Sequence, residues 1–176
     1  MSGHSKWSTI KRQKGATDAK RGAVFTKLAN AITIAIKNNH NPSTLIEKAK
    51  AANMSKDNIQ RAIDRASSRA EGQLSEAVYE GFGPMGVAII VETVSDNTTR
   101  TANELRNVFT KHGGKLATPG AASYLFQRVR EMDRLIFRPN PEMMIKLADP
   151  SKLHELLEAI DELDDVQEVY TNVNYD

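Results

Sequence analysis

The spacing of apolar residues predicts three amphipathic helices in the first part of the chain. In residues 18–37 apolar side chains recur at intervals of three and four, which places them on one face of a helix. A second helix starts at Asn41 and Pro42, a pair typical of a helix N-terminus, and ends near Ala52. Ser55 caps a third. Three such helices can bury one shared core, so we expect a three-helix bundle.

After residue 78 the pattern of apolar residues changes from a helical period to short runs typical of strands. Residues 87–91 form a short, β-branched run that is typical of a buried strand. The elements predicted after it are a helix beginning at Asp96 and Asn97, strands at 123–126 and 135–137, a helix after Asp149 and Pro150, and a last strand at 166–170. This order predicts an α+β sandwich of the ferredoxin type, with two helices on one face of a sheet.

The two parts are separated by a polar segment, residues 67–77, which we interpret as a linker. The predicted domains are therefore a basic arm with a helical bundle at 1–70 and a ferredoxin-like α/β sandwich domain at 78–176. Residues 1–17 are either a flexible or partly ordered arm or a disordered solubilising tail. Trp7 favours the arm, because a lone tryptophan in a tail indicates a contact.

Composition narrows the function classes. The 176 residues include no cysteine, which excludes disulfides, thiolate metal sites and a cysteine nucleophile and suits a reducing, cytoplasmic location. No apolar run approaches the roughly 20 residues of a membrane span. The basic N-terminus lacks the apolar region of a secretory signal. We therefore expect a cytoplasmic protein without a membrane partner.

Charge is divided unevenly along the chain. The first 21 residues contain six Lys or Arg and one Asp. Residues 1–70 carry a formal charge of +10, and residues 71–176 carry −8. A basic front and an acidic back indicate a polyanionic partner for the front.

The basic front predicts contacts to nucleic acid. Lys and Arg neutralise phosphates and release counterions, and tryptophan can stack on an unpaired base with about 1–3 kcal/mol. The predicted contact residues are Lys6, Trp7, Lys11, Arg12, Lys14, Lys20, Arg21 and Lys27. Composition alone does not choose DNA over RNA, and no recognition helix of a helix-turn-helix is evident.

Three other patterns have ordinary structural interpretations. Residues 81–86 match G-x-G-x-x-G, but they precede a strand and include Pro84, so a tight turn is favoured over a dinucleotide site. The histidines are too scattered for a metal site. The acidic run near residues 161–165 lacks calcium-loop spacing and suits a solvated helix end. Without a catalytic constellation, we expect no enzyme activity, metal, cofactor or small-molecule substrate.

Several motifs resemble those of the YebC/PmpR family, which includes the mitochondrial translational activator of cytochrome c oxidase subunit I. They span nearly the whole chain. The matching residues are Gly3-His4-Ser5-Lys6-Trp7, Tyr79-Glu80-Gly81-Phe82-Gly83-Pro84, Asp96-Asn97 with Arg100-Thr101, Gly113-Gly114 and Asp164-Asp165-Val166-Gln167. By this resemblance, Asp96, Asn97 and Arg100 form a family-specific loop.

The chain also departs from typical members of this family in one region. Typical family members carry an extra α/β domain inserted in the sheet domain, whereas here Phe126 is followed within a few residues by Leu135. The chain therefore resembles a short form with the inserted third domain absent near 128–135.

The resemblance implies a non-enzymatic regulator of gene expression. Bacterial members are labelled DNA-binding transcriptional regulators, and others bind ribosomes and relieve translational stalls. Both roles require DNA or rRNA as a partner, and the acidic domain offers a surface for protein contacts. The alternative is a protein–protein adaptor whose basic arm binds an acidic protein surface.

Overall fold

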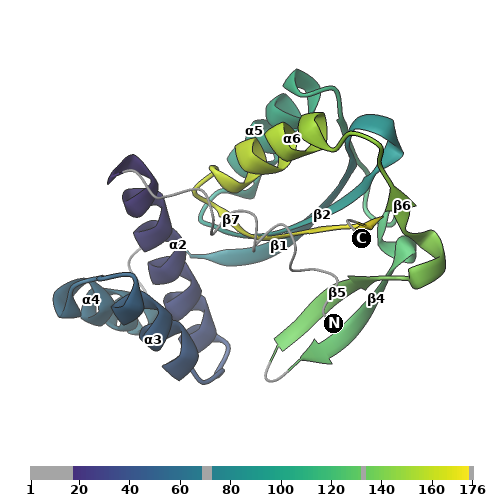
Figure 1. The fold of residues 1–176 in the computed structure, drawn as a ribbon. Helices are drawn as coiled ribbons and strands as arrows, with labels where there is room; N and C mark the ends of the chain where they lie inside the picture. The colour runs from purple at the N-terminus through teal and green to yellow at the C-terminus, as the bar shows by residue number, and fades with distance from the viewer. Residues whose placement is uncertain (1–17, 69–72, 132–133, 175–176) are drawn as a thin grey trace.

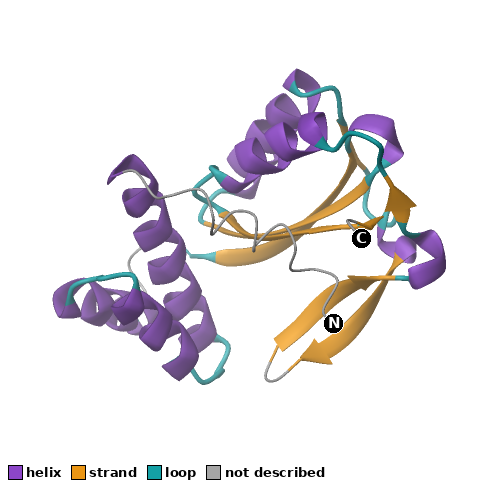
Figure 2. Cartoon of the chain, viewed as in Figure 1, coloured by secondary structure: helices purple, strands orange, loops and turns teal. Residues whose placement is uncertain are grey.

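The structure is a computed structural model that describes residues 18–68, 73–131 and 134–174, with side chains from Arg21 onward in the first helix. The described chain has an α+β architecture: three helices form one part, and a sheet with two further helices forms the other (Figures 1 and 2). None of its described helices combines the length and apolar character needed to cross a membrane.

The three predicted helices of the front part are present. They are α2 (Asp18–Lys37), α3 (Ser43–Ala51) and α4 (Lys56–Ser67). The Ser55 hydroxyl accepts the backbone N–H of Asn58 at 3.2 Å, so the predicted cap of α4 is confirmed. Their shared apolar core consists of Ile32, Ala49, Met54, Ile59 and Ala62.

The second part is built on a four-stranded antiparallel sheet. Its strands are β1 (Ser75–Phe82), β2 (Ala88–Ser95), β3 (Lys115–Ala117) and β7 (Val166–Thr171), in the order β3-β1-β2-β7. Helices α5 (Thr98–Lys111) and α6 (Ser151–Asp161) cover one face (Figure 1). Their leucines and Phe109 pack with Ile89 and Val91 of β2 in the main core.

A β-hairpin covers part of the opposite face. It consists of β4 (Phe126–Glu131) and β5 (Arg134–Pro139) and lies across the sheet from α5 and α6 (Figure 1). Phe126, Ile136 and Phe137 of the hairpin pack with Ile90 and Tyr170 of the sheet. Because residues alternate along a strand, β2 is buried on both sides.

Short elements complete the chain. They are the 3₁₀ helices η1 (Pro84–Gly86), η2 (Ser123–Leu125) and η3 (Pro141–Met143), and the parallel pair β6 (Ile145–Lys146) and β8 (Val173–Asn174). The glycine motif at 81–86 ends β1 and forms its turn into β2, where Gly86 has a φ of 75° that suits glycine.

The ferredoxin-type order is not confirmed. The described sheet does have two helices on one face, but its chain order is β1-β2-α5-β3, then α6-β7, so it begins with a hairpin. The expected order lacks β1, whose first residues fall in the predicted linker. Glu76, Glu80 and Gly81 weaken the strand signal of this segment, and pairing with β2 over eight residues compensates.

The predicted strand at 123–126 is wrong over most of its length. Ser123–Leu125 is the 3₁₀ helix η2, and β4 begins at Phe126. The carboxylate of Glu80 accepts the backbone N–H groups of Ala122 and Ser123. These donors are therefore bound to a side chain instead of a neighbouring strand.

Candidate nucleic-acid interface

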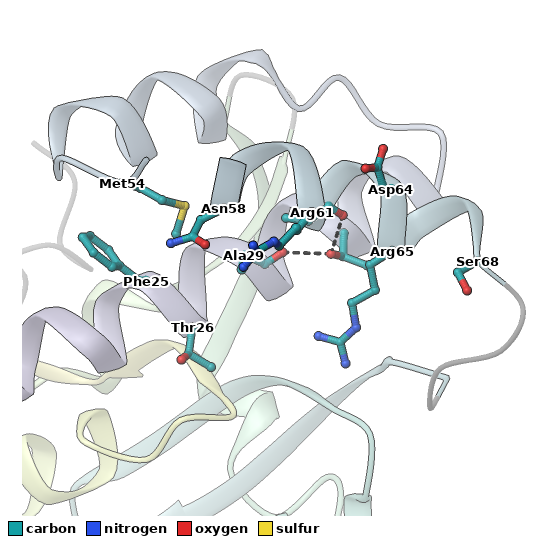
Figure 3. A pocket seen from close by; sticks show the side chains of 11 residues that line it. Phe25, Thr26, Ala29, Met54, Asn58, Arg61, Asp64, Arg65 and Ser68 are labelled. Carbon is teal, nitrogen blue, oxygen red and sulfur yellow. Dashed lines mark hydrogen bonds between the residues drawn. The ribbon is translucent and has the colours of Figure 1, made fainter. Parts of the chain in front are cut away.

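An open groove lies between α2 and α4 (Figure 3). It has a volume of about 550 Å³, and its lining includes Phe25, Ala29 and Met54 on the apolar side and Arg61 and Arg65 on the basic side. The two arginines lie one turn apart on α4 and therefore share one side of that helix. The groove thus combines apolar surface with two cations and the carboxylate of Asp64.

Hydrogen bonds hold the two walls of the groove together. The buried hydroxyl of Thr33 on α2 lies 2.8 Å from the carbonyl oxygen of Ala62 on α4 and 3.0 Å from that of Ala29. Arg65 donates from Nη1 to Oδ1 of Asn30 at 3.2 Å. This hydrogen bond orients Arg65, which is half-buried. Arg61, by contrast, is exposed to solvent.

The residues predicted to contact nucleic acid are only partly covered by the structure. Lys6, Trp7, Lys11, Arg12 and Lys14 lie outside the described residues, and Lys20 is described for its backbone alone, within α2. Arg21 is exposed on α2. The predicted site is therefore described only at Arg21 and Lys27.

Lys27 lies at the junction between the two parts of the molecule. Its Nζ is 3.5 Å from Oδ1 of Asp161, and the side chains are 13% and 18% exposed. The ammonium also donates to the backbone carbonyl of Asp161, the last residue of α6. The C-terminus of a helix carries partial negative charge, so Lys27 is stabilised there and turned away from solvent.

The predicted loop of Asp96, Asn97 and Arg100 forms the start of α5. Oδ1 of Asn97 accepts the backbone N–H of Arg100 at 3.0 Å and caps the helix. The guanidinium of Arg100 lies 2.9 Å from Asp96 and 3.0 Å from Asp165. The structure thus brings these three residues together around a fourth, Asp165.

Asp165 is the member of this cluster that the sequence interpretation missed. Its carboxylate is buried and accepts hydrogen bonds from Ser95 at 2.9 Å and Thr101 at 2.6 Å. Burial raises the pKa of Asp165, but the hydrogen bonds from Thr101, Arg100 and Ser95 outweigh it, so the pKa lies below its ordinary value.

The solvated helix end expected for the acidic run is therefore wrong for Asp165, and Asp161 is paired with Lys27. The sequence signal that could have found the cluster is the pair of small hydroxyl residues, Ser95 and Thr101, on either side of the Asp96-Asn97 cap. Two buried hydroxyls require an acceptor, and a second acidic motif at Asp164 and Asp165 supplies one.

A second cleft, of about 450 Å³, runs between the helical part and this cluster. Its lining includes Asn30 and Arg65 from the helices and Asp96, Arg100 and Asp164 from the sheet part. Across the described ranges, no group of three or more histidine or acidic side chains is placed to hold a metal ion. The cleft is polar and mainly acidic, because its lining has five carboxylates and two arginines.

Two family models match successive segments of the chain. Residues 5–69 match the family model described as the TACO1/YebC protein N-terminal domain. Residues 74–133 match the model described as the TACO1/YebC second and third domain. The two matches meet at the polar segment between α4 and β1.

Curated relatives carry the name "Probable transcriptional regulatory protein". The one from Rubrobacter xylanophilus is 53% identical over 137 residues, which cover 73% of this chain and 55% of that protein. The one from Finegoldia magna is 52% identical over 136 residues, which cover 73% of this chain and 56% of that protein. The chain thus matches little more than half the length of these relatives.

A solved structure shares the fold over most of the chain. It is titled "Crystal Structure of a Conserved Hypothetical Protein Aq1575 from Aquifex Aeolicus" and superposes with a TM-score of 0.78 at 32% identity. The alignment covers 89% of this chain and 91% of that one. Taken with the two family-model matches and the curated relatives, this shows that the chain belongs to the TACO1/YebC family.

Proposed function

We propose that this protein is a regulator of gene expression that binds nucleic acid through its basic front part. The observation that carries the proposal is the division of charge, +10 in residues 1–70 against −8 in residues 71–176. A separated positive region attracts a polyanion over a distance of about 10 Å at moderate salt. The acidic part is repelled by the same polyanion, so the molecule binds with one orientation.

The described helices support this orientation. Arg21 on α2 and Arg61 on α4 are exposed cations, and Arg65 borders the groove between these helices. The contact set that we propose is the basic N-terminal segment with Arg21, Arg61 and Arg65. Lys27 is omitted because its ammonium is held by Asp161.

The names of the curated relatives favour DNA as the target, since they describe transcriptional regulators. Trp7 and the unspecific basic segment fit structured RNA, such as rRNA, because stacking requires an unpaired base. Both targets present the same phosphate backbone. The proposal requires no cofactor and places the protein in the cytoplasm.

The test is a charge reversal in the front segment. The triple variant Lys11→Glu/Arg12→Glu/Lys14→Glu is compared with the natural chain for binding to labelled duplex DNA and to labelled rRNA fragments, by fluorescence anisotropy over a range of KCl concentrations. The matched control reverses three exposed cations of the acidic part, Arg106→Glu/Lys111→Glu/Lys115→Glu, and changes the net charge equally.

We expect the front variant to lose binding and the control to retain most of it. Each lost phosphate contact reduces the slope of log affinity against log salt by about 0.7–0.9. Unchanged affinity in the front variant would refute the proposed interface. Complexes from lysate that survive nuclease treatment would instead support an adaptor that binds an acidic protein.

A further inference from the structure

The β4–β5 hairpin interrupts the acidic character of the second part. Residues 71–176 contain ten Lys or Arg, and four of them lie in the fourteen residues of this hairpin: Arg128, Arg130, Arg134 and Arg138. The hairpin lies on the face of the sheet opposite α5 and α6 (Figure 1). A positive element is thus placed apart from the α2–α4 groove.

Two of the four arginines are paired with carboxylates. Arg134 bridges two glutamates of the sheet, with Nη2 3.4 Å from Glu92 and Nη1 3.2 Å from Glu168. Arg138 pairs across the hairpin with Glu131 at 3.5 Å. Their charge is largely neutralised by these partners.

The other two arginines lie on β4. Arg128 and Arg130 are exposed, lie two residues apart on β4 and therefore share one face of the strand. Within the described part of the chain, neither forms a salt bridge. The guanidinium of Arg128 lies 4.9 Å from the ring centre of Phe137, which is buried and orients it.

An exposed apolar side chain lies beside these cations. Leu135 is opposite Arg130 in the hairpin register and is 52% exposed. Arginine guanidinium groups bind phosphates through paired donors and stack on unpaired bases. A strip of two exposed guanidinium groups, one of them oriented by an aromatic ring, and an exposed leucine therefore suits a nucleic-acid strand with accessible bases.

We propose that Arg128 and Arg130 form a second nucleic-acid contact, which binds a single-stranded segment beside the target of the front part. This inference rests on the proposed function, because it gives both elements the same partner. The repulsion proposed above between the acidic part and the polyanion then applies to the rest of that part and not to the hairpin.

The test uses the full chain with the double variant Arg128→Glu/Arg130→Glu. Glutamate also keeps the edge of β4 charged, so the variant preserves the protection that charge gives an exposed strand against aggregation. The matched control is Arg106→Glu/Lys111→Glu on the exposed surface of α5, with the same change in net charge. Circular dichroism and thermal unfolding check that both variants fold.

Binding is measured by anisotropy with a labelled 20-nucleotide single-stranded RNA and with duplex DNA of the same length, over a range of KCl. We expect the hairpin variant to bind single-stranded RNA roughly tenfold more weakly than the control at low salt, with a salt slope reduced by about 1.4 for two lost contacts. Duplex binding should change less.

The front variant Lys11→Glu/Arg12→Glu/Lys14→Glu separates the two proposals. Loss of binding in the front variant, with equal affinity and slope in the hairpin variant and its control, overturns the hairpin contact and leaves the proposed function intact. Failure of the natural chain to bind either probe overturns both. An equal loss on duplex and single strand overturns the preference for accessible bases.

Discussion

At the residue scale, Glu80 organises a loop through three backbone hydrogen bonds. Its carboxylate accepts the N–H groups of Gly120 at 2.8 Å, Ala122 at 2.7 Å and Ser123 at 2.8 Å. Burial raises the pKa of Glu80, but these hydrogen bonds outweigh it and lower the pKa below the ordinary value. The loop carries Ala122, which packs in the core beneath the hairpin.

Replacing Glu80 with glutamine should lower the free energy of unfolding by about 2 kcal/mol. The amide of glutamine has only one acceptor oxygen, and its NH2 group would face a backbone N–H donor of the loop. Urea unfolding measures the difference. Glu76→Gln on the same strand is the control, since Glu76 is exposed and bonded only to the amide of Asn38 among the described residues. Equal effects of the two substitutions would contradict the role assigned to Glu80.

The contribution of Glu80 should also depend on pH. A lowered pKa in the folded state means that the stabilisation is complete above the unfolded pKa, near 4.5, and is lost as the pH falls through the lower folded pKa. The difference in unfolding free energy between the natural chain and Glu80→Gln should therefore be constant near neutral pH and shrink below about pH 4.5. A difference that grows on acidification would have the wrong sign.

At the scale of the element, the β4–β5 hairpin depends on the sheet for its position. A two-stranded hairpin is marginally stable alone. Arg134 joins it to Glu92 and Glu168, which face each other across β2 and β7 and would otherwise repel. Burial raises the pKa of Glu92, although the hydroxyl of Tyr170 and the guanidinium of Arg134 oppose the increase. The ion pair and the apolar contacts thus both hold the hairpin in its position on the sheet.

Arg134→Ala should loosen the hairpin while changing global stability by less than about 1 kcal/mol, because the pair is half exposed and screened. Amide hydrogen exchange should become faster in β4 and β5 and remain slow in β1 and β2. The control is Arg130→Ala in the same hairpin. If both substitutions change exchange equally, the attachment through Arg134 is not supported.

At the scale of the whole molecule, the helical part meets the sheet part at a junction between α2 and β2. Ile34 of α2 packs with Leu74 and Val94 in a separate apolar cluster. The ion pair of Lys27 and Asp161 lies at the same interface. Since the apolar cluster at this junction is separate from the cores of the two parts, we expect the junction to limit how cooperatively the molecule unfolds.

Ile34→Ala should lower the free energy of unfolding by about 2–4 kcal/mol, because it removes buried methyl groups from the junction. Hydrogen exchange should accelerate first in α2–α4, with β2 and β7 less affected. Ile34→Val keeps the branched packing and should cost about 0.5–1.5 kcal/mol. A uniform increase in exchange over both parts would show that they unfold as one unit.

The sequence alone determined the elements whose signals are local. The apolar period of α2, the caps of α4 and α5, and the leucine face of α6 depend on residues within a few positions of one another, and each element is present near its predicted place. The division of charge and the family motifs can likewise be read directly from the amino-acid sequence. These local signals led to the helices, the α+β class and the family.

Only the tertiary structure decided the elements and sites that depend on distant partners. β1 is a strand because β2 pairs along its full length, and 123–125 is a 3₁₀ helix because Glu80 binds it. Asp165 meets Arg100 from 65 positions away, and Lys27 meets Asp161 from 134. Such contacts depend on chain closure between remote segments, which local propensity does not encode.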